Sequence, residues 1–180
     1  MSPLDKIFRK TDGQNKEKRK PKGRIERINL IRRDSDSLAD IIQKDYDTAL
    51  SDLTTGSAFQ PKKDRHGPYI VELYIEENKL VFHITNTKGK DLPFLVLSLR
   101  PYQRIIKDYF MIVQSYDEAV RDGKPSRIEA IDMGRRGLHN EGAELLQARL
   151  SDKITMDMNT ARRLFTLICV LHMGKTHTLR

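Results

Sequence analysis

The sequence predicts a single α+β domain in which an antiparallel sheet of three to four strands packs against about four helices. Apolar and polar residues alternate in consecutive short segments between residues 69 and 99, which is the period of half-buried strands. From residue 101 onward, apolar residues recur every three or four positions, which is the period of amphipathic helices. Strands followed by helices are typical of α+β folds, and 180 residues suffice for one domain with a real core.

Basic charge is concentrated at the N-terminus. Of the formal net charge of +8, residues 1–24 carry +6, because nine Lys or Arg residues there are set against three acidic residues. Residues 13–24 contain no apolar side chain, so they cannot bury enough surface to offset the entropy of ordering them. We therefore expect residues 1–23 to form a disordered basic tail, residues 24–174 to form the domain, and residues 175–180 to form a short flexible C-terminus.

Two regular elements and a loop are predicted before residue 69. The first is a strand at residues 24–31, with the sequence RIERINLI. The second is a helix that begins at a Ser37 cap, runs to about Thr54 and is closed by Gly56. Residues 57–68 combine proline, glycine and charged side chains, which favours a loop.

Three strands are predicted next, at residues 69–76, 79–85 and 92–99. The first two alternate between two faces, with Val71, Leu73 and Ile75 on one face of the first and Leu80, Phe82 and Ile84 on one face of the second. The pairs Glu77–Asn78 and Lys88–Gly89 supply the intervening turns. Short turns join neighbouring strands in opposite directions, so these three should form an antiparallel meander with one face covered.

The remaining elements are predicted to be helical, apart from one short extended piece. Helices are expected at residues 101–121 and from residue 126 onward, and Pro101 suits a first helical turn. The extended piece covers residues 153–157, and a last helix covers about 160–172. The predicted buried face of that helix consists of Leu164, Leu167, Ile168 and Leu171.

Several classes of protein are disfavoured by composition. A single cysteine, Cys169, excludes an intramolecular disulfide and a cysteine-rich zinc site. The longest apolar stretch, residues 164–171, is far shorter than the roughly 18 residues needed to span a membrane. The five histidines show no metal-ligand spacing. We therefore expect a cytoplasmic protein with no metal and no cofactor.

The stretch most suggestive of a site is IEAIDMGRRGLHNEG, residues 128–142. On a helical wheel, Asp132, Arg136 and His139 share one edge, whereas Arg135 falls within the apolar sector. A guanidinium there must reach solvent or meet a carboxylate, because an unpaired buried charge is costly. The carboxylates considered as partners belong to Asp132, Asp108 and Asp117.

The glycines of this stretch allow two helix geometries. A break or kink near Gly137 is favoured, with Asn140 capping a new helix, since each glycine costs about 1 kcal/mol relative to alanine inside a helix. The alternative is one continuous helix, in which Gly134 and Gly142 let a neighbouring element approach closely.

Four interpretations of the stretch remain open. It is a structural helix contact, an anion- or RNA-binding segment, a catalytic site, or a protein-docking surface. As a binding patch it would use Arg135, Arg136, His139 and Asn140. As a catalytic site, His139 would act as acid or base oriented by Asp132, and the two arginines would hold an anionic substrate. No nucleophile of characteristic spacing accompanies them, so no catalytic residue is assigned.

Long motifs in the C-terminal half resemble Uncharacterised Protein Family 0262, which is found in alphaproteobacteria. The motifs are LSLRPYQRIIKDYFMI, SYDEAV, PSRIEAIDMGRRGLHNEGAELLQARL and TARRLFTLICVLH, and GPYIVELYIEENKLVFHI matches more loosely. The resemblance implies a small bacterial cytosolic protein and implies no activity, cofactor or catalytic residue. The long basic N-terminus departs from the family's pattern.

The leading functional hypothesis is a non-enzymatic cytosolic binding protein. Its expected partner is RNA or a ribonucleoprotein, reached through the basic tail and through Arg135 and Arg136. One alternative is a small enzyme that acts on a phosphorylated or carboxylated metabolite through the His139, Asp132 and arginine cluster. Another is a protein–protein adaptor or homodimer, which the apolar last helix suggests.

Overall fold

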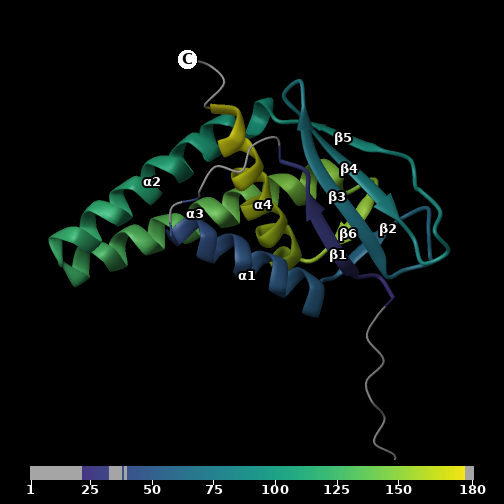
Figure 1. The fold of residues 1–180 in the computed structure, drawn as a ribbon, viewed down its shortest axis with the longest axis horizontal. Helices are drawn as coiled ribbons and strands as arrows, with labels where there is room; N and C mark the ends of the chain where they lie inside the picture. The colour runs from purple at the N-terminus through teal and green to yellow at the C-terminus, as the bar shows by residue number, and fades with distance from the viewer. Residues whose placement is uncertain (1–21, 33–37, 39, 177–180) are drawn as a thin grey trace, which may run out of the picture.

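The computed structural model describes residues 22–32, 38 and 40–176, which form an α+β fold (Figure 1). A four-stranded sheet lies at one end of the molecule, and a hairpin of two long helices extends away from it. The predicted fold class is therefore confirmed. Residues 1–21 of the predicted tail and the last four residues lie outside the described residues.

The main sheet is mixed, with the strand order β1-β3-β4-β5. Its strands are β1 (Ile25–Leu30), β3 (Tyr69–Glu76), β4 (Lys79–Thr85) and β5 (Leu95–Ser98). The last three form the predicted antiparallel meander. The expectation of a purely antiparallel sheet was wrong, because β1 pairs in parallel with β3. Parallel neighbours need a long crossover, and the chain between β1 and β3 contains a helix that provides it.

A second, two-stranded sheet was not predicted. The strand β2 (Phe59–Pro61) pairs antiparallel with β6 (Ile154–Met156), so part of the segment interpreted as a loop is extended and hydrogen-bonded. Each strand has three residues, too few to show a period of two. Their stability depends on pairing across more than 90 residues, which a local pattern cannot show.

Four helices and one 3₁₀ turn complete the fold. They are α1 (Asp40–Gly56), η2 (Arg100–Tyr102), α2 (Gln103–Asp122), α3 (Pro125–Leu150) and α4 (Met158–Thr176). All four helices were predicted, with ends displaced by a few residues. The predicted Ser37 cap lies outside the described residues, and α4 extends two residues into the segment expected to be flexible.

The helix α3 is continuous, so the break predicted near Gly137 was wrong. Gly137 is exposed, and a Cβ atom built on it would meet nothing within 4 Å. Gly142 is the glycine that packing requires, because its Cβ would lie 2.5 Å from the ring of Phe165 on α4. The cost of glycine inside the helix is therefore offset by close packing of α3 on α4.

The core lies where α4 packs against the other helices and the sheet. Helix α4 contacts α1, α3 and β3, and Figure 1 shows it between the sheet and the other helices. Its predicted buried face is confirmed, since Leu164, Leu167, Ile168 and Leu171 are all buried. Cys169 is fully buried as well, and burial raises the pKa of its thiol well above the usual value, as expected of an inert core side chain.

Candidate anion-binding site

An ion-pair network joins α1 to α3 through Arg135. Its Nη1 atom lies 2.6 Å from Oδ2 and 2.7 Å from Oδ1 of Asp45, which lies on α1. Its Nη2 atom donates to Asp132 Oδ1 at 2.7 Å, one turn earlier on α3. Burial lowers the pKa of the Arg135 guanidinium, but the bonds to Asp45 and Asp132 outweigh it and raise the pKa. The predicted need of Arg135 for a carboxylate is thus met by two.

Asp132 and Tyr109 extend this network in opposite directions. Asp132 also accepts a bond from Arg136, whose Nη2 lies 3.0 Å from Oδ2, and the bonds from Arg135 and Arg136 lower the pKa of the Asp132 carboxyl. The buried Tyr109 on α2 donates its hydroxyl to Asp45 Oδ2 at 3.2 Å. Helices α1, α2 and α3 therefore meet around matched charges.

His139 lies beside this network but is surrounded mainly by rings. Its ring centroid is 5.3 Å from that of Tyr109 and 6.0 Å from that of Phe165. Its Nδ1 atom lies 3.4 Å from Thr166 Oγ1, and its Nε2 atom is buried without a hydrogen-bond partner among the described residues. Burial lowers the pKa of His139 to about 4, so the imidazole is neutral at pH 7.

Asp45, Arg135 and His139 line a cavity of about 510 Å³ between α1, α3 and α4, here called the anion cavity. Five basic side chains surround it, namely Lys44, Arg135, Arg136, Arg162 and Arg163. Asp45 is its acidic side chain, and its neutral ones are Thr48, His139, Asn140 and Thr166. Three helices that are distant in sequence therefore contribute positive charge to one hollow.

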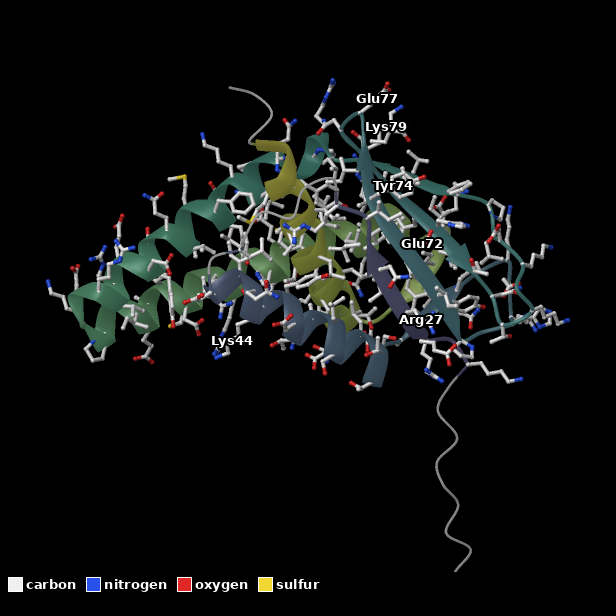
Figure 2. The ribbon with its side chains drawn as sticks, in the orientation of Figure 1. Arg27, Lys44, Glu72, Tyr74, Glu77 and Lys79 are labelled. Carbon is white, nitrogen blue, oxygen red and sulfur yellow. The ribbon has the colours of Figure 1, made fainter. Side chains whose placement is uncertain are left out.

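The basic side chains of the anion cavity differ in their partners. Arg135 and Arg136 are paired with aspartates, and Arg163 lies 2.7 Å from Asp52 on α1. Lys44 and Arg162 have no carboxylate within 4 Å among the residues that the structure describes. Figure 2 shows Lys44 projecting from α1. Positive charge without a matching carboxylate is what an anionic ligand would neutralise.

The structure brings the four predicted binding residues to one cavity, although in different states. Arg135 and His139 are largely buried, whereas Arg136 and Asn140 are exposed. The predicted catalytic pairing of His139 with Asp132 is not the arrangement present, because Asp132 accepts bonds from two arginines and His139 Nδ1 is nearest to Thr166. Their binding and catalytic roles stay predictions.

Several lining residues were missed by sequence reasoning. Asp45 carried a signal, because it falls between Ile42 and Ala49 on the buried face of α1, where a carboxylate needs a partner. Arg162 and Lys44 carried none, because adjacent charges on a helix usually belong to a solvated face. Only the packing of α4 between α1 and α3 brings them together.

Two features are absent from the part of the chain that the structure describes. No group of three or more His, Cys, Asp or Glu side chains in them is arranged to hold a metal ion. None of their helices combines the length and the apolar character required to cross a membrane.

The fold and the site define an α+β protein with a basic cavity among three helices. The chain belongs to the Uncharacterised protein family (UPF0262), whose model matches residues 22–174. The match includes the start of every helix and strand described above and excludes the first 21 residues, which carry +4 of the formal net charge of +8.

Bacterial relatives are similar over most of their length. A UPF0262 protein of Brucella anthropi is 52% identical over 132 residues, which cover 73% of this chain and 82% of the relative. A UPF0262 protein of Brucella canis is 51% identical over 132 residues, with the same coverage of both chains. No solved structure matches this chain.

Proposed function

We propose that this protein binds a small anionic ligand and that a phosphate or carboxylate group of the ligand occupies the anion cavity. The observation that carries the proposal is the unbalanced positive charge: of the five basic side chains that line the hollow, three are paired with aspartates, which leaves two without a carboxylate among the described residues. Lys44 and Arg162 would make the first contacts, because neither has a carboxylate partner among the described residues. A bound anion would offset their mutual repulsion.

Arg135 and Arg136, which are paired with aspartates, would have different roles in the site. Arg135 is held by Asp45 and Asp132, so its guanidinium is fixed in place and its charge is balanced by theirs. Arg136, with a side chain that is 77% exposed, can turn one edge of its guanidinium to the ligand while the other edge stays on Asp132. The cavity thus combines a fixed cation with adaptable ones.

His139 and Thr166 would supply neutral polar contacts. A neutral imidazole can donate or accept a hydrogen bond, and the buried Nε2 atom has neither role filled among the described residues. A site with cations at its rim and neutral groups at its base suits a ligand that is charged at one end. This arrangement favours binding over acid–base catalysis, because the pKa of His139 is about 4 and therefore lies far from pH 7.

The test is titration calorimetry with inorganic phosphate and pyrophosphate at low ionic strength. Lys44→Ala and Arg162→Ala should each weaken binding by roughly five- to tenfold, as expected for losing one charge-assisted contact. Lys107→Ala is the matched control, since Lys107 is an exposed lysine on α2 that does not line the cavity. Equal weakening by Lys107→Ala, or no binding by the unaltered protein, would contradict the proposal.

The association with RNA or a ribonucleoprotein stays a separate prediction. It depends on the basic residues 1–23, of which 1–21 lie outside the described residues, and on Arg135 and Arg136, which are already paired with carboxylates. Full-length protein and a form beginning at residue 25 should then differ in affinity for RNA, with a salt dependence that shrinks in the shorter form. Similar affinities would exclude a role for the tail. A protein partner or homodimer is likewise untested and is best checked by light scattering.

A further inference from the structure

A second hollow adjoins the anion cavity along the groove between α1 and α4. Its volume is about 290 Å³, and here it is called the polar annex. Arg163 lines both hollows, and Arg162 of the anion cavity donates to Asn159 of the annex at 2.9 Å. The two hollows are therefore neighbours, and one ligand of moderate size can reach both.

The polar annex differs chemically from the anion cavity. Hydroxyl and amide groups dominate its lining, through Thr55, Ser57, Asn159 and Thr160. The residues that line it include no aromatic ring, and Leu53 is its large apolar side chain. The annex therefore offers little to an aromatic base, which binds best by stacking, and much to a ligand rich in hydroxyl groups.

Two of the residues that line the annex, Ser57 and Thr160, have buried hydroxyl groups. Ser57 Oγ accepts a bond from the Ile25 amide at 2.8 Å, and Thr160 Oγ1 accepts one from the Ala58 amide at 2.9 Å. Ser57 is 6% exposed and Thr160 2% exposed. Each hydroxyl oxygen therefore has a hydrogen-bond partner in the protein, and its O–H can still donate to an acceptor oxygen that a ligand supplies.

Arg163 links the two hollows. Its Nη2 atom lies 2.7 Å from Asp52 Oδ2, and both side chains are partly exposed. Asp52 also lines the annex, where its carboxylate can accept hydrogen bonds from hydroxyl groups of a ligand. Donors and one strong acceptor in the same hollow are the combination that binds a polyol, whose hydroxyl groups both donate and accept.

We infer that the ligand is a phosphorylated polyol of the sugar-phosphate class. Its phosphate occupies the anion cavity, and its hydroxyl-bearing chain or ring lies in the polar annex. This inference rests on the proposed function, because it assigns the anionic group to the site described above. The two-hollow arrangement predicts that a sugar phosphate binds more tightly than inorganic phosphate, because inorganic phosphate fills one hollow and a sugar phosphate fills both.

Gly56 allows the annex to be closed without disturbing the anion cavity. It is the last residue of α1 and lines the annex, and a Cβ atom built on it would meet nothing within 4 Å. Its backbone is not in the left-handed region, so a larger residue fits there without strain. Gly56→Phe therefore adds a bulky ring at the edge of the annex, where it should obstruct a ligand, and Gly137→Phe on the exposed face of α3 is its matched control.

The experiment compares titrations with inorganic phosphate, ribose 5-phosphate and ribose. The unaltered protein should bind ribose 5-phosphate at least tenfold more tightly than inorganic phosphate. Gly56→Phe should abolish that preference and leave the affinity for inorganic phosphate within twofold of the unaltered protein's. Gly56→Ala and Gly137→Phe should keep the preference for ribose 5-phosphate. The unchanged phosphate affinity also reports that Gly56→Phe is folded.

Two results would overturn the inference, and they are distinguishable. Equal affinity of the unaltered protein for inorganic phosphate and ribose 5-phosphate would contradict the polyol subsite. A preference for ribose 5-phosphate that persists in Gly56→Phe would contradict it as well. Neither result would contradict phosphate binding in the anion cavity. Absence of any phosphate binding by the unaltered protein removes the proposed function itself.

Discussion

Two faces of α3 place neighbouring arginines in opposite environments. Arg135 lies on the face that packs toward α1 and α4, where its side chain is 20% exposed and is paired with Asp45 and Asp132. Arg136 lies at the solvent edge, where its side chain is 77% exposed and keeps a single ion pair. The same side chain is therefore a structural strut at one position and an adaptable contact at the next.

The glycines of α3 repeat this contrast. Gly142 is buried against Phe165, whereas Gly137 is exposed to solvent. The inner face thus carries the residues that determine how α3 packs, and the outer edge carries residues that are free to change. Mutations that remove contacts of the inner face should lower stability, and mutations at the edge should not.

The largest effect is expected from Asp45→Ala. This substitution removes two hydrogen bonds from Arg135 and leaves a half-buried guanidinium with Asp132 as its remaining carboxylate. The free energy of unfolding should fall by about 2–3 kcal/mol, because a partly buried cation loses a partner that it cannot replace with water. Urea denaturation measures the change. Asp47→Ala, on the exposed side of the same helix, is the control, and an equal loss there would show that the inner face has no special role.

A second test compares the two glycines directly. Gly142→Ala should lower the free energy of unfolding by about 1–2 kcal/mol, because the added Cβ forces the fully buried Phe165 ring to move. Gly137→Ala should raise it by about 0.5–1 kcal/mol, because alanine favours the helix and meets no neighbour. Thermal denaturation of both variants gives opposite shifts of Tm. Stabilisation by both substitutions would mean that α3 and α4 are less closely packed than the structure shows.

The pH dependence of stability should separate His139 from His83, a histidine on the sheet. The pKa of His139 is lowered to about 4, so the folded state binds fewer protons than the unfolded state between pH 6.5 and 4. Its neutral form favours folding at pH 7, and this contribution is lost as the pH falls through that window, by about 1–2 kcal/mol. Denaturation at pH 7 and pH 4.5 should show a smaller decrease for His139→Gln than for the unaltered protein.

His83 is the contrasting case in the same measurement. Hydrogen bonds to Glu72 and Asp91 raise its pKa, so its charged form stabilises the fold below pH 6.5, and that contribution is lost as the pH rises through the folded-state pKa. His83→Gln should therefore reduce stability more at pH 5 than at pH 8. The same pH profile in both variants would contradict the assignment of opposite environments.

Local features of the chain could be predicted, and long-range ones could not. Strands 69–76 and 79–85 were placed at their observed ends, because alternation and the Glu77–Asn78 turn are local signals. The requirement that Arg135 meet a carboxylate was also local, since it follows from its place on the helical wheel. Its main partner, Asp45, is 90 residues away, and no sequence pattern states which helices pack together.

The candidate site shows the same division. Arg135, Arg136, His139 and Asn140 were predicted from one continuous stretch, and all four line the anion cavity. The opposite wall comes from Lys44 on α1 and the α4 arginines, which the helix arrangement alone brings near. The predicted break at Gly137 was wrong because it took account only of the local cost of glycine in a helix, about 1 kcal/mol for each residue. The long-range contact of Gly142 with Phe165 stabilises the continuous helix.

The smallest effect on stability is expected from Arg136→Ala. The Arg136 side chain is 77% exposed, and its partner Asp132 stays paired with Arg135 when Arg136 is removed. The free energy of unfolding should therefore change by less than about 0.5 kcal/mol. Binding of inorganic phosphate should nevertheless weaken by roughly threefold, since one adaptable cation is lost from the rim of the cavity. Arg127→Ala, an exposed ion-paired arginine of α3 away from the cavity, is the matched control. A loss of stability as large as that of Asp45→Ala would erase the distinction between the two faces, whereas unchanged stability with weakened binding would locate ligand recognition at the solvent edge of α3.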